Sequence, residues 1–284
     1  MRRLVALVCA AVVLSGCTSG VDDSGGSTGL TAESPSSGPG TTAGGEPTAP
    51  RSTPPAPPSP ACYRLTLEQL TRQSNRSRPV PCTGRHDAQT IHVGRLAKGA
   101  DGETVPVDSD RARIQQARTC QRRLAAFVGG TREDRDLSRF VVVWFSPTPA
   151  QAERGADWFR CDLVALGGGE TLHRLPPPRR ASGILDRDGL ATYGLCGTAE
   201  PGTPAFERVI CGRRHSWRAV GTIRLPGTER YPGAARTRRL GDQPCRDRVR
   251  ALADDPLAFE YGWEWPTRTQ WEDGQRYGYC WRPS

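Results

Sequence analysis

Residues 62–284 lack the short motifs that mark common hydrolase and metalloprotease sites. They contain no G-x-S-x-G, H-E-x-x-H or S-x-x-K, so the usual nucleophile elbow, zinc helix and serine–lysine arrangement are excluded. Cysteines nowhere form the C-x₂₋₄-C pair that is common in structural zinc sites. The sequence therefore predicts no metal, no cofactor and no catalytic residue.

A long apolar run is also missing. The chain opens "MRRLVALVCAAVVLSGC", in which the apolar stretch Leu4–Leu14 follows Arg2 and Arg3. This stretch is shorter than the roughly 20 residues that span a bilayer, and it has the length of a signal-peptide core. Leu14-Ser15-Gly16-Cys17 resembles the bacterial lipobox. We therefore expect residues 1–16 to be a lipoprotein signal peptide, with Cys17 lipidated and the exported protein anchored to the outer face of the plasma membrane.

Residues 17–61 contain the lipidated cysteine and a stretch of Ser, Thr, Gly and Pro with few apolar side chains. Such a composition cannot bury enough surface to offset its ordering entropy, so it predicts a disordered tether. Treated as a flexible coil, it would span roughly 35–40 Å.

Cysteine is abundant beyond the tether. Of ten cysteines, Cys9 leaves with the signal peptide and Cys17 takes the lipid. In an exported protein, the other eight predict disulfides. They divide four and four along the chain: Cys62, Cys82, Cys120 and Cys161, then Cys196, Cys211, Cys245 and Cys280.

The cysteines belong to an internal repeat. "CTGRHDAQTIHVGRL" (82–96) aligns with "CGRRHSWRAVGTIRL" (211–225), and "PTPAQAERGADWFRC" (147–161) aligns with "PTRTQWEDGQRYGYC" (266–280). We predict two copies of one domain, copy one at 62–166 and copy two at 191–284. A Gly- and Pro-rich linker at 167–190 would join them without regular elements. The fold class is α+β: two tandem, small, disulfide-stapled domains, each an antiparallel sheet with one packed helix.

Three pairings of four cysteines are possible within each copy, and we expect the first to join the second and the third the fourth. In copy one, residues 108–130 predict a helix that ends at Gly129-Gly130, with Cys120 on its apolar face. Two strand-like runs follow, 139–145 and 157–166. Cys161 lies in the second, and we expect Val141, Val143 and Phe145 on its face. A helix and a strand sharing a core can bring Cys120 and Cys161 together.

Copy two departs from this pattern. Gly241 to Pro244 should interrupt its helix before Cys245. A hairpin centred near residue 271 would set three aromatic residues against three others and leave Cys280 on the opposite face, unless a bulge intervenes. The expected pairs involve Tyr261, Trp263 and Trp265 on one strand and Tyr277, Tyr279 and Trp281 on the other.

The repeated Cys-x-x-x-His motif has three possible interpretations: a metal site, a catalytic histidine or a structural unit. Cys82 and Cys211 are expected in disulfides, which removes the thiolates. Neighbours on a strand point to opposite faces, so His86 and Asp87 do not form a ready pair, and Ser216 follows His215. We therefore interpret both histidines as structural, with a binding role for either as the alternative.

Residues 62–284 hold 36 basic and 26 acidic residues, a net charge of +10, and Lys98 is their only lysine. Outside the membrane a nucleic-acid partner is not expected, and anionic cell-wall polymers or lipid headgroups are the natural counter-charges. The alternative is a solvated surface whose arginines reflect a GC-rich genome. Trp and Tyr residues of copy two are either a sugar-stacking face or core. These candidate binding residues are Trp263, Trp265, Tyr277 and Tyr279.

Taken together, these motifs resemble the actinobacterial septum-formation domain family. The resemblance lies in Cys-x-x-x-His-Asp before a strand, a cysteine within a helix, and a final Gln, Gly and Cys. The matching residues in copy one are Cys82, His86, Asp87, Cys120, Gln151, Gly155 and Cys161. Those in copy two are Cys211, His215, Cys245, Gln270, Gly274 and Cys280.

The resemblance implies an exported, membrane-associated protein of cell division or envelope organisation, with no established catalytic residue. We predict a non-enzymatic envelope lipoprotein that binds a protein or a cell-wall polymer. The alternative is an enzyme acting on envelope glycan, with His86 or His215 as acid or base.

Overall fold

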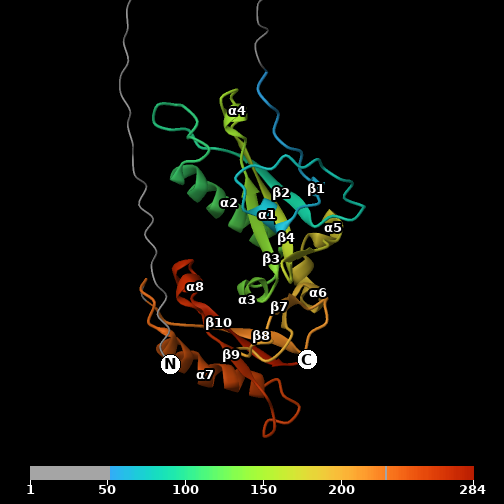
Figure 1. Ribbon diagram of the computed structural model, residues 1–284, viewed down its shortest axis with the longest axis vertical. Coiled ribbons are helices and arrows are strands. Elements are labelled where there is room, and N and C mark those ends of the chain that lie inside the picture. Colours follow the sequence, from blue (N-terminus) through green and yellow to red (C-terminus); the bar gives the residue numbers. More distant parts are fainter. Residues whose placement is uncertain (1–51, 228) are drawn as a thin grey trace, which may run out of the picture. The chain divides into compact units, whose positions relative to one another are not determined.

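Two five-stranded antiparallel sheets form the framework of the protein in a computed structural model that describes residues 52–227 and 229–284 (Figure 1). The described residues belong to one compact unit. The predicted signal peptide, Cys17 and most of the predicted tether lie outside the described residues. Within the described part, no helix combines the length and apolar character needed to cross a membrane.

Copy one provides the first sheet, in the order β1-β2-β4-β3, and β5 (Thr171–His173) from the segment after it also pairs with β4. Its elements are β1 (Cys62–Tyr63), α1 (Leu67–Leu70), β2 (Ala88–Arg95), α2 (Asp110–Val128), α3 (Arg132–Asp136), β3 (Phe140–Phe145), α4 (Pro149–Ala152) and β4 (Trp158–Gly168). Copy two provides the second sheet, in the order β7-β6-β8-β10-β9. Its elements are β6 (Leu195–Gly197), β7 (Arg208–Ile210), β8 (Trp217–Arg224), α7 (Ala234–Arg250), β9 (Gly262–Glu264), α8 (Arg268–Glu272) and β10 (Tyr277–Pro283).

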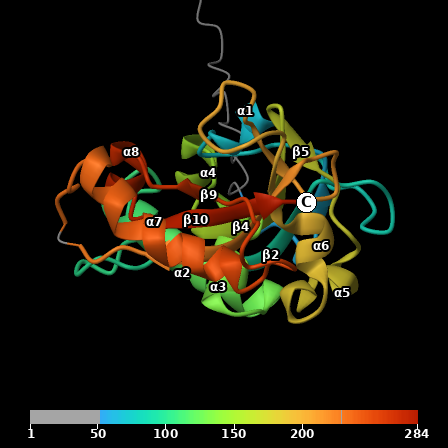
Figure 2. The ribbon, with the colours of Figure 1, turned by 90° about the horizontal axis from the view of Figure 1, so that it is seen from below.

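The two copies share one topology, which confirms the predicted α+β fold class. The order β1-β2-β4-β3 in copy one matches β6-β8-β10-β9 in copy two, and all these pairs are antiparallel. A long helix, α2 or α7, precedes the last two strands of this order in each copy, and a short helix, α4 or α8, connects them. Figures 1 and 2 show α7 lying along the sheet of copy two beside β10.

The long helices bury equivalent positions at four-residue steps. In α2 the spacing runs through Ala112, Gln116, Cys120, Leu124 and Val128. In α7 it runs through Thr237, Gly241, Cys245 and Val249. A step of four residues places side chains on one face of a helix, so each helix turns its cysteine toward its own sheet.

The predicted interruption of the second helix is wrong, because α7 continues from Ala234 to Arg250 with Pro244 inside it. Pro244 is exposed and removes one backbone donor without facing the core. Gly241 has a packing role, since a Cβ atom there would lie 1.9 Å from Cζ2 of Trp263. The glycine that looks like a helix breaker in the sequence makes room for a buried indole.

Strand register differs by one residue from our expectation in both copies. In β3, Trp144 lies opposite Cys161 and Val142 opposite Leu163, so Val142 and Trp144 share the cysteine's face. Val141, Val143 and Phe145 pack instead in a second cluster on the other side of the sheet. The run "FVVVWF" is apolar at every position, because both faces of this sheet are covered, and alternation therefore carries no information on register.

In copy two the register sets Cys280 opposite Trp263 and Tyr279 opposite Glu264. The three predicted aromatic pairs do not form. Trp263 instead shares the α7 side of the sheet with Cys280, whereas Tyr279 and Trp281 pack on the other side. A bulge does occur, between Cys280 and Trp281 where β10 pairs with β8, but the register alone places Cys280 on the same face as an aromatic residue.

The segment between the copies contains regular elements, contrary to our expectation. They are β5 (Thr171–His173), α5 (Pro178–Ala181), the 3₁₀ helix η1 (Ile184–Asp186) and α6 (Gly189–Tyr193). Leu175, Ala181 and Leu185 belong to the hydrophobic core of copy one. This burial of apolar side chains holds a Gly- and Pro-rich stretch in a defined path.

Helix α3 of copy one contacts the sheet and helix of copy two. The Glu133 carboxylate accepts a hydrogen bond of 2.8 Å from the Thr222 backbone N–H and one of 2.9 Å from Arg248. Asp136 pairs with Arg224, and the Leu195 N–H donates to the Leu137 carbonyl at 2.7 Å. Charged side chains and backbone together therefore join the two copies within one unit.

Candidate functional site

The repeated Cys-x-x-x-His forms the same turn in both copies. Nδ1 of His86 lies 3.0 Å from the Gly84 carbonyl, and Nδ1 of His215 lies 2.8 Å from the Arg213 carbonyl. In each case the ring reaches the carbonyl two residues before it, just ahead of the strand β2 or β8. The geometry supports a structural role, because a ring hydrogen bond closes the turn that the cysteine begins.

The two histidines differ in exposure. His86 is fully buried, and its Nε2 has no hydrogen-bond partner among the described residues. Asp87 beside it accepts a hydrogen bond of 2.7 Å from the Leu65 N–H, and burial raises the pKa of its carboxyl. His215 is half-buried. A fully buried ring cannot touch a polymer substrate in this structure, so His215 is the more accessible of the two candidates.

Four disulfides form, with the pairing expected from the sequence. They join Cys62 to Cys82, Cys120 to Cys161, Cys196 to Cys211 and Cys245 to Cys280. In each copy one bridge ties the first strand to the histidine turn, and the other ties the long helix to the central strand β4 or β10. Every one of these cysteines is thus engaged, and no cluster of His, Cys, Asp and Glu suited to a metal occurs among the residues described.

The final repeated motif, Thr-x-x-Gln-x-x-x-Gly, builds the connection between the last two strands. Thr148 caps α4, and the Gln151 side-chain oxygen accepts a hydrogen bond of 2.9 Å from the Thr148 N–H. Thr267 and Gln270 form the same capping box on α8, at 2.8 Å. Gly155 and Gly274 follow with φ of 85° and 91°, a conformation that favours glycine. These shared residues therefore determine local structure.

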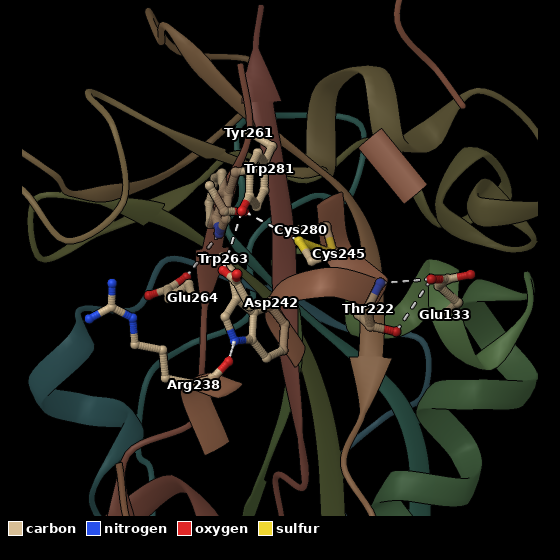
Figure 3. The surroundings of a disulfide bond; sticks show 11 residues. Glu133, Thr222, Arg238, Asp242, Cys245, Tyr261, Trp263, Glu264, Cys280 and Trp281 are labelled. Carbon is tan, nitrogen blue, oxygen red and sulfur yellow. Dashed lines mark hydrogen bonds between the residues drawn. A yellow bond between two sulfur atoms is a disulfide. The ribbon is translucent and has the colours of Figure 1, made fainter. Parts of the chain in front are cut away.

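The candidate aromatic residues of copy two divide between core and surface. Trp263 and Tyr279 are each only 7% exposed, so of the two alternatives, core and sugar-stacking face, these two rings fit the core. Trp263 donates from Nε1 to the Arg238 carbonyl at 3.1 Å, close to the Cys245–Cys280 bridge (Figure 3). Trp265 and Tyr277 are half-buried. Sequence alternation could not separate these residues, because the register decides which rings are covered.

A buried ion pair in copy one escapes sequence reasoning. Arg160 and Asp162 lie on β4 with exposures of 3% and 0%, and Nε of Arg160 lies 3.1 Å from Oδ2 of Asp162. The guanidinium also lies 4.0 Å from the ring centre of Tyr63. Thr90 donates a hydrogen bond of 2.7 Å to the carboxylate. The positions i and i+2 on a strand are the one signal that could have suggested this pair.

Burial of Asp162 should make stability depend on pH. Desolvation raises the pKa of its carboxyl to about 6, although Arg160 and Thr90 act in the opposite direction. Between pH 4 and 6 the folded protein holds a proton that the unfolded chain releases, so the free energy of unfolding should fall as pH rises through this range, by up to about 3 kcal/mol. Urea unfolding at pH 4.5 and 7 would measure the fall, and Asp162→Asn should remove this contribution. An unchanged pH dependence in that variant would contradict the assignment.

The geometry defines a tandem pair of disulfide-stapled α+β units whose shared motif residues hold the turns, caps and bridges. A family model described as "Septum formation" matches residues 29–137 and 99–280, which together cover more than half of the chain. The protein therefore belongs to the septum-formation family. No curated protein and no solved structure matches the chain.

Proposed function

We propose that the protein is an exported, non-enzymatic lipoprotein that serves septum formation by binding a protein or cell-wall partner at a distance from the membrane. The observation that carries the proposal is the use of the shared motif. Its cysteines form bridges, its histidines close turns, and its glutamines cap helices. Because these repeated residues maintain the fold, they do not point to a catalytic group that the two copies share.

The sequence supports the exported location. The amino-terminal signal, the lipobox cysteine Cys17 and the Ser/Thr/Gly/Pro tether would hold the two copies near the outer face of the plasma membrane. Four disulfides suit an oxidising compartment. A net charge of +10 on residues 62–284 suits an anionic partner in the wall.

Imaging of a fluorescent fusion in dividing cells tests this proposal, with a fluorophore that matures outside the cytoplasm. We expect enrichment of the full-length protein at the septum. Cys17→Ala should release the protein from the membrane fraction, because the lipid anchor is lost. A uniform surface distribution of the wild-type fusion throughout division would contradict a role at the septum, and retention of Cys17→Ala in membranes would contradict the anchor.

The enzymatic alternative has a direct test of its own. The mature chain, purified without lipid as the Cys17→Ser variant, would be incubated with cell-wall glycan and the soluble fragments measured. We expect no turnover above background. Turnover that disappears in His215→Ala or His86→Ala, with the fold retained by near-ultraviolet circular dichroism, would instead identify a glycan-acting enzyme.

A further inference from the structure

Arginines and half-buried aromatic rings run side by side along one edge of copy two. Arg238 lies 5.5 Å from the ring centre of Trp265, and Arg246 lies 6.0 Å from that of Tyr261. Arg250 lies 5.5 Å from that of Phe259. We call these six residues the arginine–aromatic ladder. Arg238 and Arg246 are exposed, and Arg250 and the three rings are half-buried.

The ladder follows from the packing of α7 on β9. Arg238, Arg246 and Arg250 are separated by multiples of four residues, so they lie along one edge of the helix, over about 18 Å. Trp263 lies between Tyr261 and Trp265 along the chain and is buried against Gly241. Its indole anchors the strand beneath the helix, and its neighbours on either side reach the surface. β9 is the edge strand of its sheet, so no other strand of the described residues covers this flank.

Acidic side chains also lie along the same flank. Asp242 accepts a hydrogen bond of 3.4 Å from the Tyr261 hydroxyl. Asp247 pairs with Arg250 at 3.2 Å. Glu260 is exposed between two of the rings. The flank thus holds three arginines and three carboxylates. Helix α7 as a whole carries six arginines against two aspartates, so the positive charge that an anionic ligand meets belongs to the helix and not to the ladder alone.

Copy one shows that the fold does not require the ladder. Aligning the helices on Cys120 and Cys245 places Arg113, Ala117, Gln121 and Ala125 at the positions of Arg238, Asp242, Arg246 and Arg250. Along the strand, Val142 replaces Tyr261 and Ser146 replaces Trp265. The same topology and bridges therefore form without the alternation of guanidinium and ring. A feature that appears in one copy only, at its surface, fits a role in binding.

We propose that the ladder binds a linear anionic glycan, one that presents sugar rings and carboxylate or phosphate groups in alternation. This inference rests on the proposed function and names its partner class. Aromatic faces stack on the apolar faces of sugar rings, and guanidinium groups form paired hydrogen bonds with carboxylates and phosphates. An edge of about 18 Å is long enough to engage an oligomer, so affinity grows with chain length.

Titration calorimetry on the mature Cys17→Ser chain tests the ladder with three defined polymers of similar length. Polygalacturonate carries rings and charge, polyglutamate carries charge without rings, and a neutral glucan carries rings without charge. We expect binding of polygalacturonate to exceed that of the other two by about tenfold or more. Equal binding of polyglutamate would overturn the proposal in favour of an acidic polypeptide or of charge alone.

Two triple variants separate the ladder from bulk charge. Arg238→Gln/Arg246→Gln/Arg250→Gln should weaken polygalacturonate binding about tenfold. The control variant Arg118→Gln/Arg122→Gln/Arg123→Gln removes three exposed arginines from α2. Its affinity for polygalacturonate should stay within about twofold of the wild-type value. Trp265→Leu should weaken binding of polygalacturonate and not that of polyglutamate. Equal losses in the two triple variants would overturn the proposal.

Septal imaging of the wild-type protein keeps this inference distinct from the proposed function. If the wild-type protein reaches the septum but binds none of the polymers, the ladder assignment fails and the septal role stands. If the wild-type protein is not enriched at the septum, the proposed function fails whatever the polymer measurements give.

Discussion

Replacing Gly241 with alanine should lower the free energy of unfolding by about 2 kcal/mol. The sign of this change is informative, because glycine-to-alanine replacement in an exposed helix interior raises the free energy of unfolding by roughly 1 kcal/mol. The added Cβ would lie 1.9 Å from Cζ2 of Trp263. That indole is 7% exposed and is held by its 3.1 Å hydrogen bond to the Arg238 carbonyl, so it cannot move aside without loss. Overpacking of a core commonly costs about 1–3 kcal/mol.

Chemical denaturation followed by tryptophan fluorescence would measure this effect, and Pro244→Ala is the matched control. Residue 244 is exposed in the same helix, three positions later. Alanine there restores a backbone donor and should raise stability by about 1–3 kcal/mol. A stabilising Gly241→Ala would contradict the packing of Trp263 against this glycine. A destabilising Pro244→Ala would show that the helix depends on its proline.

Removing the bridge between helix and strand in copy one should have the largest effect on stability. The Cys120→Ala/Cys161→Ala double variant opens a loop of 41 residues, for which the chain-entropy model gives about 4 kcal/mol. Both cysteines are fully buried, so the smaller alanines also lose packing. Thermal or chemical unfolding of the oxidised proteins would measure the loss.

The Cys62→Ala/Cys82→Ala double variant is the comparison for that measurement. Its loop has 20 residues, and the same model gives about 3 kcal/mol. We therefore expect both variants to be destabilised, with the helix–strand bridge contributing more. A loss below about 1 kcal/mol for Cys120→Ala/Cys161→Ala would mean that the bridge does not constrain the chain as proposed.

Much of the fold is readable from the sequence because cysteine constrains it. The repeat, the disulfide pairing and the helix closed by Gly129 follow from residues whose chemistry allows few alternatives. The capping boxes of Thr148 and Thr267 are also visible as Thr-x-x-Gln, since such a motif needs only local geometry.

Strand register was less predictable, for a physical reason. β3 is apolar at all six positions and is buried on both sides, so a shift of one residue leaves the hydrophobic pattern unchanged. The same shift in copy two moved Trp263 to the side of Cys280. Gly241 and Pro244 led to the wrong prediction of a helix break, because tertiary packing outweighed their local tendency to end a helix. The arginine–aromatic ladder depends on both points, so sequence alone could not locate it.

Peptide mapping of the non-reduced, alkylated protein by mass spectrometry tests the central claim, that each copy is a separately bridged unit whose repeated residues maintain its fold. The account predicts four linked peptide pairs, Cys62 with Cys82, Cys120 with Cys161, Cys196 with Cys211 and Cys245 with Cys280. A bridge between the copies, or alkylated free thiols at several of these positions, would contradict it.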